Sequence, residues 1–520
     1  MDAFLGLDLG TSSLKALLVD ESGRVVGSGS AEYPVRHPQP GWAEQDPDDW
    51  WAAAVAAARQ ATGWAPTGTR VAGIGLSGQM HGTVLLGDQG RPIAPAIIWA
   101  DGRSWRHVGE VTGRIGAEKL IGIAGSPLAA GFMAATAAWL QQEQASLWFR
   151  TRRLLAPKDE LRRRLTGEIA TDPGEASGSL LLDVRWRSWS PDLLRAARID
   201  EARLPALRPS AAVAGTLTAR AAEEMGLPAG VPVATGTGDA PAGLLGAGIT
   251  DPKTMLLSIS TGAQVMIPAE GVSPDPLGRS HTFCSALEPG PGSPGWYQMG
   301  ATLAAGMAMR WLRDEMLDLR GPDAWERMTG WAASRPVGAN GLLFLPYLVG
   351  ERSPHMDARL RAAFLGLGDH HGRGDLVRAV MEGATLACLD AFAVLEEQGA
   401  APERIVIAGG GARSPLWRQI AADAFGMPVH LLATADQAAM GAAVLAAAAA
   451  GGHDPVPTAA RWASYGPATE PNRARFARYQ EVFALYREAH AATRDLSHKL
   501  VAFAEPAREA VKPTRPSRAR

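Results

Sequence analysis

Short apolar runs separated by small and polar residues open the chain. The runs cover 4–9, 14–19 and the positions from Val25 onward, and the turns between them have the sequences GTSS and ESGR. Apolar runs of this length joined by such turns are typical of strands in hairpins. The pattern therefore predicts an antiparallel meander of three strands.

A different period begins in the segment QDPDDWWAAAVAAARQ, residues 45–60. Asp46 is the expected N-cap of a helix, Pro47 its first residue, and two further acids follow in its first turn. Short apolar strands then alternate with helical patterns up to about residue 248. This alternation predicts an α/β architecture built in layers.

The pattern of the first hairpin returns in the second half of the chain. The segment MLLSISTGAQVMIP, residues 255–268, again shows an apolar strand, a turn of small residues and a second strand. When the two segments are superposed, Ser258 corresponds to Asp8, Ser260 to Gly10 and Thr261 to Thr11. The repeat predicts two related domains, 1–249 and 250–500, and a chance match of so few small residues is the alternative.

The last part of the chain shows a helical pattern and then a change of composition. Apolar residues recur at helical spacing in 474–503. From residue 505 the segment is rich in proline and arginine and almost free of apolar side chains. Such a segment cannot bury enough apolar surface to offset the entropy of ordering, so 505–520 is predicted to be disordered. A basic arm that binds nucleic acid is the alternative interpretation.

Composition narrows the classes of function. The 520 residues are 46% hydrophobic and 20% charged, which is typical of a globular protein with more than one domain. A net charge of −2 argues against a nucleic-acid or membrane-surface partner, since neither attracts a nearly neutral protein. Two distant cysteines, Cys284 and Cys388, and no secretory pattern in the first residues predict a cytoplasmic protein without disulfides.

The segment LDLGTSSLK, residues 7–15, is a candidate phosphate site. A strand that ends in Asp8 and turns at Gly10 and Thr11 places a carboxylate beside several backbone N–H groups. Such N–H groups bind phosphate oxygens, and the carboxylate binds a hydrated Mg²⁺. A plain β-hairpin explains the pattern equally well.

The segment SGQMHG, residues 77–82, is a candidate site for a small polyol. Its glycines leave the backbone accessible, and Gln79, Met80 and His81 offer an amide, a thioether and an imidazole. A histidine with a purely structural role is the more frequent alternative.

Three consecutive glycines mark a third candidate, in the segment VIAGGGARSPLWRQIAADAFGMPV, residues 406–429. Gly409, Gly410 and Gly411 would let a flat ligand such as adenine lie against bare backbone. The helix that opens at Ser414 favours negative charge at its N-terminus. A simple strand-to-helix connection needs one glycine, so three of them favour a function.

Other nucleotide-binding patterns fail in their context. The segment GIGLSG, residues 73–78, fits a dinucleotide pattern, but a loop and a strand follow it where a helix is required. No G-x-x-x-x-G-K-[ST] segment occurs. In VATGTGDAPAGLLGAG, residues 233–248, a single acid, Asp239, lies among glycines. Those glycines are turn residues, a phosphate cradle, or space for a substrate beside a catalytic base.

Together and in this order, these segments resemble the FGGY family of carbohydrate kinases. The resemblance covers roughly residues 3–490 and also rests on GWAEQDPDDWW, APKDELRRRLTGEIATDPGEASG, GTGDAPAG, LPYLVGERSPHMD and LVRAVMEGATLACLD. It implies two actin-like, ribonuclease-H-like domains around a central cleft. It also implies transfer of the γ-phosphate of ATP to a sugar. The QMHG segment points to a ketose, D-xylulose above all, and a homodimer is left open.

The resemblance also implies roles for single residues. Asp239 would be the catalytic base, and Asp8 and Asp239 would hold Mg²⁺ largely through water. Gln79, Met80 and His81 would bind the ketose together with Asp239. The groups expected to bind ATP and its phosphates are Gly10, Thr11, Ser12, Lys15, Ser260, Thr261, Gly262, Gly409, Gly410, Gly411 and Ser414.

Two positions depart from the family pattern. The family has asparagine where this chain has Ala240, directly after the expected base, and again where it has Ala100. Both changes remove amide groups expected to face the sugar. Ribulose, sedoheptulose and pentitols therefore remain alternative substrates, and a nucleotide-binding regulator without catalysis is the alternative from another class of function.

Overall fold

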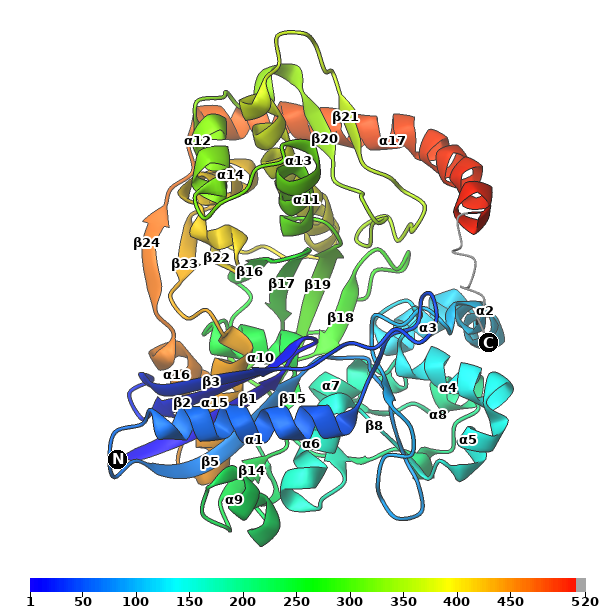
Figure 1. Ribbon diagram of the computed structural model, residues 1–520, viewed down its shortest axis with the longest axis vertical. Helices are drawn as coiled ribbons and strands as arrows, with labels where there is room; N and C mark the ends of the chain where they lie inside the picture. Colours follow the sequence, from blue (N-terminus) through cyan, green and yellow to red (C-terminus); the bar gives the residue numbers. More distant parts are fainter. Residues whose placement is uncertain (511–520) are drawn as a thin grey trace, which may run out of the picture.

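The computed structural model describes the backbone of residues 1–510 and the side chains of residues 1–504. Figure 1 shows two α/β bodies stacked along the long axis, each built around one mixed sheet with helices packed against it. The N-terminal half of the chain forms the lower body, and most of the C-terminal half forms the upper one.

The sheet of the first body has the strand order β13-β14-β5-β1-β2-β3, with β15 also pairing β5. Strands β1, β2 and β3 are antiparallel, which confirms the predicted meander, and β5 runs parallel to β1. Their bounds are β1 Asp2–Leu9, β2 Ser13–Asp20, β3 Val25–Glu32, β5 Arg70–Gly78, β13 Val213–Thr216, β14 Pro232–Ala234 and β15 Thr237–Gly238.

The sheet of the second body repeats this design in the order β18-β19-β17-β16-β22-β23-β24. Strand β16 pairs antiparallel with β17 and parallel with β22, as β1 pairs with β2 and β5. The two sheets therefore share their central strand order and strand directions. The bounds are β16 Thr254–Ile259, β17 Ala263–Ala269, β18 His281–Cys284, β19 Trp296–Thr302, β22 Arg404–Ala408, β23 Val429–Leu432 and β24 Tyr465–Thr469.

The helices that position the site fall into two groups. Helix α1 begins after Asp46, whose side chain accepts a hydrogen bond from the Asp48 amide, as the N-cap pattern predicts. The first body contains α1 Pro47–Gly63, α2 Trp105–Ile115, α3 Ala117–Ala124, α4 Met133–Glu143, α5 Ala145–Arg150, α6 Pro157–Thr166, α7 Pro173–Ser177, α8 Pro191–Ala197, α9 Ala219–Met225 and α10 Asp239–Gly246. The later helices are α11 Gly306–Trp311, α12 Ala324–Ala333, α13 Arg373–Glu397, α14 Pro415–Phe425, α15 Gln437–Ala450, α16 Pro455–Trp462 and α17 Arg473–Ala510.

Within residues 1–510, the remaining strands form five short two-stranded sheets. They are β4 Glu44–Gln45 with β7 Ala96–Ile97, β6 Val84–Leu86 with β8 Arg153–Leu155, β9 Ala170–Thr171 with β12 Ala206–Leu207, β10 Leu182–Asp183 with β11 Ser188–Trp189, and β20 Leu343–Leu345 with β21 Ala363–Leu365.

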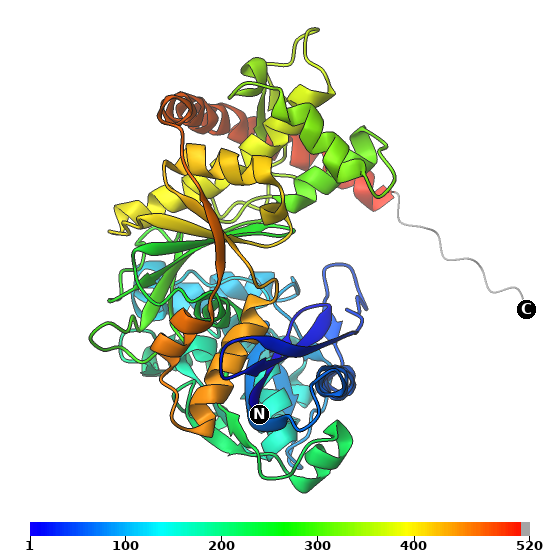
Figure 2. The ribbon, with the colours of Figure 1, turned by 90° about the vertical axis from the view of Figure 1, so that its left-hand side faces the viewer.

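Helix α15 belongs to the second half of the sequence but packs in the first body. It lies against β1, β5 and α10, and Figure 2 shows it in orange beside the blue strands. The contact is so close that a Cβ on Gly441 would lie 1.9 Å from the Ala242 carbonyl oxygen, and one on Gly75 would lie 1.8 Å from that of Ala442. A boundary at residue 250 therefore does not separate the two bodies, because α15 returns to the first.

The expected disordered tail begins inside a helix. Helix α17 continues to Ala510, five residues beyond the predicted start of disorder at 505. The rest of the predicted tail, 511–520, lies outside the described residues. Within residues 1–510, no helix combines the length and apolarity needed to cross a bilayer.

Candidate functional site

Asp8 and Asp239 lie at the same edge of the first sheet. Strands β1, β5 and β15 run parallel, and Asp8 pairs in register with Ser77, which pairs with Thr237. The Ser77 hydroxyl donates a hydrogen bond of 2.7 Å to Asp8. Asp239 follows β15 directly as the first residue of α10. The topology thus brings together two acids that are 231 positions apart in the sequence.

The electrostatics of the two carboxyl groups differ from those of ordinary surface acids. Burial, and then the negative charge of Asp8, raises the pKa of Asp239 to about 7, against the backbone N–H groups at the start of α10. Burial also raises the pKa of Asp8, while Ser77 and Lys15 oppose this shift. A carboxyl group with a pKa near neutrality can accept a proton and later release it at physiological pH.

The backbone turn after β1, residues 10–12, is fixed from several sides. Tyr33 donates its hydroxyl to the Gly10 carbonyl at 2.5 Å, and Gln45 donates its amide to the Thr11 carbonyl at 2.6 Å. The Trp99 indole donates to the Thr11 hydroxyl at 3.0 Å. The turn is therefore held in one conformation before any ligand arrives, with Ser12 exposed at its tip.

Gln79 contributes to the support of this turn. Its amide nitrogen donates to Gln45 Oε1 at 2.7 Å, and its side chain is buried. Its amide nitrogen also lies 3.4 Å from the Gly10 carbonyl oxygen, while its Oε1 has no hydrogen-bond partner among the described residues. Gln79 therefore helps to position the turn 10–12, and its role in substrate binding stays a prediction.

Lys15 forms an ion pair that the sequence did not indicate. Its ammonium group lies 2.5 Å from a carboxylate oxygen of Asp436, the residue that precedes α15. Because α15 comes from the second half of the chain, this pair joins the two halves beside Asp8. Lys15 is engaged with Asp436 and is not free for a phosphate in this conformation.

His81 is held in a defined orientation next to Met80. It has a positive φ of 72°, its Nδ1 lies 2.7 Å from the Gly178 carbonyl oxygen, and its ring stacks on Phe132 at 3.9 Å between centroids. Burial lowers the pKa of His81 to about 4, so the ring is neutral at physiological pH. Since the carbonyl needs a donor, Nδ1 carries the hydrogen and Nε2 is left as an acceptor for a hydroxyl.

The second body contributes side chains to this region. The Phe283 ring lies 6.0 Å from that of His81, and the Tyr297 hydroxyl lies 3.9 Å from the sulfur of the buried Met80. His281 is bound through Nδ1 to the Ser126 hydroxyl at 2.7 Å. Phe283, Tyr297 and His281 did not stand out in the sequence, because they lie within ordinary apolar strands.

The turn 260–262 occupies the same place in the second sheet as 10–12 in the first. The Ser260 and Thr261 carbonyl oxygens accept hydrogen bonds from the Gly306 and Ala305 amides at 2.9 and 3.0 Å, just before and at the start of α11. Ser260 and Thr261 are exposed, and Gly262 is half-buried. The turn therefore presents its hydroxyl groups to solvent while its carbonyl groups fix it to the body.

The three glycines of residues 409–411 are under different structural constraints. Gly409 has a φ of +86°, and a Cβ there would lie 2.4 Å from the Ile259 carbonyl oxygen. A Cβ on Gly411 would lie 2.5 Å from the Ile259 side chain, whereas one on Gly410 would meet nothing within 4 Å. Packing explains two of the glycines, and only Gly410 leaves open space. Ser414 caps α14 by accepting a hydrogen bond from the Trp417 amide at 3.2 Å.

A buried ion network lies behind the strand that leads to Asp239. Asp172 accepts hydrogen bonds from the Thr237 hydroxyl at 2.6 Å, from Ser210 at 2.8 Å and from Lys158 at 3.1 Å. Lys158 also donates to the Thr235 carbonyl at 3.3 Å. These charged residues come from the segment 156–178, whose chemistry the sequence left unexplained. Their contacts fix the backbone immediately before Asp239.

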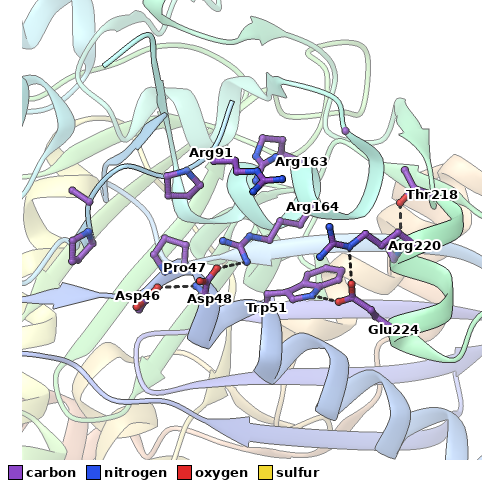
Figure 3. A pocket seen from close by; sticks show the side chains of 15 residues that line it. Asp46, Pro47, Asp48, Trp51, Arg91, Arg163, Arg164, Thr218, Arg220 and Glu224 are labelled. Atoms are coloured by element: carbon purple, nitrogen blue, oxygen red, sulfur yellow. Dashed lines mark hydrogen bonds and ion pairs between the residues drawn. The ribbon is translucent and has the colours of Figure 1, made fainter. Parts of the chain in front are cut away.

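A cavity of about 590 Å³ lies elsewhere, between α1, α6 and α9. Figure 3 shows its arginines, among them Arg164, 2.7 Å from Asp48, and Arg220, 2.9 Å from Glu224. None of the residues predicted to bind sugar, ATP or metal lines this cavity. Two of its arginines are thus paired with carboxylates of the same cavity.

Comparison with known proteins decides the family. The model of the N-terminal domain of the FGGY family of carbohydrate kinases matches residues 3–246, and that of the C-terminal domain matches residues 255–450. The chain belongs to the FGGY carbohydrate kinases. It is therefore an ATP-dependent sugar kinase with the two-domain, actin-like arrangement of that family.

Individual relatives cover nearly the whole FGGY kinase chain. It is 35% identical to a xylulose kinase of Lactococcus lactis over 97% of this chain and 99% of the relative. It is 34% identical to a xylulose kinase of Escherichia coli over 93% of this chain and 99% of that relative. The crystal structure of a xylulose kinase from Rhodospirillum rubrum superposes with a TM-score of 0.88 at 31% identity, covering 95% of this chain and all of that one. A gluconokinase of Bacillus subtilis is 28% identical over 86% of this chain.

The two departures from the family pattern lie in different environments. Ala240 is the second residue of α10 and is 7% exposed, directly beside the predicted base. Ala100 is exposed in the turn after Trp99. A change from asparagine to alanine at 240 thus alters the interior of the site, whereas the change at 100 alters its surface.

Proposed function

We propose that this FGGY kinase transfers the γ-phosphoryl group of ATP to D-xylulose and forms D-xylulose 5-phosphate. The observation that carries the proposal is Asp239, a carboxyl group with a pKa of about 7 at the start of α10, beside Asp8. The xylulose kinases among its relatives support this substrate, and so does His81 with a free acceptor nitrogen.

In the proposed reaction Asp239 accepts the proton of the C5 hydroxyl while the sugar oxygen attacks the γ-phosphorus. General-base assistance of this kind contributes roughly 10²–10⁴-fold. The bond from phosphorus to the bridging oxygen of ADP breaks as the new bond forms, and Asp239 releases the proton to solvent afterwards. His81 and Met80 orient the ketose, with His81 Nε2 accepting a hydrogen bond from a sugar hydroxyl.

The nucleotide is assigned to groups on both bodies. Residues 10–12 and 260–262 bind the phosphates through backbone N–H and hydroxyl groups, and Lys15 contributes when it leaves Asp436. Gly409, Gly410, Gly411 and Ser414 accommodate the adenosine. Since catalysis of phosphoryl transfer consists mainly of alignment and charge stabilisation, this division between two bodies suits the reaction.

The acids fit a magnesium ion that is shared with the nucleotide. Among the described residues, no three His, Cys, Asp or Glu side chains are placed to enclose a metal, but Mg²⁺ usually binds one or two carboxylates, water and substrate phosphates. Asp8 and Asp239 form such a pair: burial raises the pKa of both, and the charge of Asp8 raises that of Asp239 further. The ion would neutralise part of the phosphate charge.

The test is to incubate the purified protein with Mg-ATP and each of a panel of sugars. The release of ADP measures phosphorylation. The panel contains D-xylulose, ribulose, sedoheptulose and pentitols, compared by kcat/KM. The highest kcat/KM is expected for D-xylulose. A clear preference for another sugar would contradict the substrate and would be explained by Ala240. Phosphorylation of none would favour a nucleotide-binding regulator.

A further inference from the structure

The segment LPYLVGERSPHMD contains an arginine, Arg352, that the proposed mechanism does not use. Its neighbours fix the backbone to the second body. Glu351 Oε1 accepts a hydrogen bond from the Leu303 amide at 2.7 Å, and the Ser353 amide donates to the Ala301 carbonyl at 2.9 Å. The base of the Arg352 side chain is therefore anchored beside the end of β19.

The Arg352 side chain reaches from the second body to the first. Its guanidinium carbon lies 5.7 Å from the centre of the Trp99 ring. Trp99 belongs to the first body and donates its indole N–H to the Thr11 hydroxyl. The charge of Arg352 also contributes to lowering the pKa of His81. Arg352 thus lies where the turn 10–12 and the predicted ketose site meet.

Arg352 has no anionic partner. Among the described side chains, no carboxylate lies within 4 Å of its guanidinium group, and no hydrogen bond of that group is present. Arg103, in the same region, shows the opposite situation, because it pairs with Glu44 at 2.7 Å and Asp101 at 2.8 Å. Burial lowers the pKa of Arg352 although the charge of the neighbouring Glu351 opposes this shift, so burying this cation without an ion pair is costly.

We infer that Arg352 is a catalytic residue that binds the phosphoryl group during its transfer and in the sugar-phosphate product. This inference rests on the proposed function. A guanidinium group offers only donors, arranged to match phosphate oxygens, and the ketose itself carries no charge. In phosphoryl transfer the negative charge spreads over the equatorial oxygens, so an unpartnered cation beside Thr11 stabilises it. Arg352 supplies hydrogen bonds and charge, while the proton still goes to Asp239.

The experiment compares Arg352→Gln, Arg352→Lys and the control Arg359→Gln with the wild type. Arg359 lies two residues after this segment, and its side chain is exposed. For Arg352→Gln we expect kcat to fall at least ~100-fold, a loss of the size seen when one donor to a developing charge is removed. Inhibition by the sugar-phosphate product should weaken at least tenfold, while the KM of the ketose stays within threefold. Arg352→Lys should retain part of kcat, and Arg359→Gln should behave like the wild type.

The other outcomes separate the possible roles of Arg352. A kcat of Arg352→Gln within threefold of an active wild type would overturn the inference alone. A raised ketose KM with unchanged product inhibition would show a sugar contact and contradict it as well. Thermal unfolding of each variant identifies a loss of fold, and Arg352→Lys retains the charge if Arg352→Gln does not fold. A wild type inactive on every sugar would overturn the proposed function and, with it, this inference.

Discussion

At the scale of single residues, the chemistry depends on how two acids share one sheet edge. An isolated Asp239 in a flexible glycine segment would titrate near its ordinary value. Here the start of α10 buries it and Asp8 repels its charge, and together these raise its pKa to about 7. The glycines before it serve close packing: a Cβ on Gly238 would lie 2.6 Å from Met80.

The raised pKa of Asp239 predicts a pH-dependent activity. A general base must be deprotonated, so kcat/KM should rise with pH and reach half of its maximum near pH 7 in the free enzyme. Steady-state kinetics between pH 5.5 and 8.5 with D-xylulose would measure this. In Asp239→Asn, kcat should fall at least ~100-fold, while calorimetry still shows binding of ATP. A flat profile, or turnover in Asp239→Asn, would contradict the assignment.

The same pKa shift predicts that the stability of the fold decreases with pH, whereas the activity increases. Asp239 binds its proton more tightly in the folded than in the unfolded protein, so the folded state loses stability as the pH rises from about 4 to above 7. Asp239→Asn should therefore unfold at an equal or higher temperature than the wild type at pH 8. This result would also show that its inactivity is not a loss of fold.

Sequence motifs predicted the residues whose role depends on their own chemistry, and missed those whose role depends on a partner. Asp8 and Asp239 were predicted because an acid after a strand or among glycines is unusual. The contact of Gln79 with Gln45 was not predicted, because it depends on packing between distant segments. Arg352 was not singled out, since nothing in its segment indicates that its guanidinium reaches Trp99 of the other body.

At the scale of elements, charged residues in α6 and directly before α7 hold the strand that leads to Asp239. Lys158 and Asp172 are fully buried and contact Thr235 and Thr237. Lys158 pairs with both Asp172 and Asp159, at 3.1 and 2.8 Å. Removal of one carboxylate leaves this buried cation incompletely compensated, which costs about 3–5 kcal/mol. The charged pattern of this segment, taken alone, is equally typical of a solvated helix, so the sequence could not indicate its role.

Asp172→Asn should weaken both the fold and the positioning of Asp239. We expect a loss of about 3 kcal/mol in the free energy of unfolding, measured with denaturant, and a kcat lowered more than the ketose KM is raised. Asp192→Asn is the matched control, because Asp192 lies in an exposed ion pair with Lys119 and such pairs contribute about 1 kcal/mol or less. Equal stability of the two variants would contradict the role of the network.

Helix α15 makes the second testable contact between elements. In Gly441→Ala the added methyl group would meet the Ala242 carbonyl oxygen of α10, so the helices must move apart. We expect a loss of at least ~2 kcal/mol in the free energy of unfolding, as for overpacked cores. Gly109→Ala is the control, because nothing lies within 4 Å of that position in α2 and alanine is the better helix former. It should be neutral or stabilising, and the same loss in both variants would refute the packing explanation.

At the scale of the whole molecule, the repeat of one sheet design explains why the site is divided. Strands β1 and β16 occupy equivalent places in the two sheets, so the turns 10–12 and 260–262 after them are equivalent too. The hydrophobic pattern predicted this repeat, because each hairpin is local in sequence. It did not predict that α15 crosses back to the first body, since that contact joins residues about 200 to 430 positions apart.

The division of the site predicts that ligands bring the two bodies closer together. ATP phosphates held by 10–12 and 260–262 at once favour the conformation in which both turns reach them, and a sugar between Asp239 and Arg352 adds to this preference. Small-angle scattering should therefore show a smaller radius of gyration with a non-hydrolysable ATP analogue and D-xylulose than with either alone. The melting temperature should rise in the same order, because a ligand at 100 times its Kd stabilises the folded state by about 2.7 kcal/mol.

Arg352→Gln should reduce the additional compaction, because it removes a contact from the second body. If the radius stays unchanged while both ligands bind in calorimetry, the prediction is wrong and the bodies already lie in their reactive arrangement.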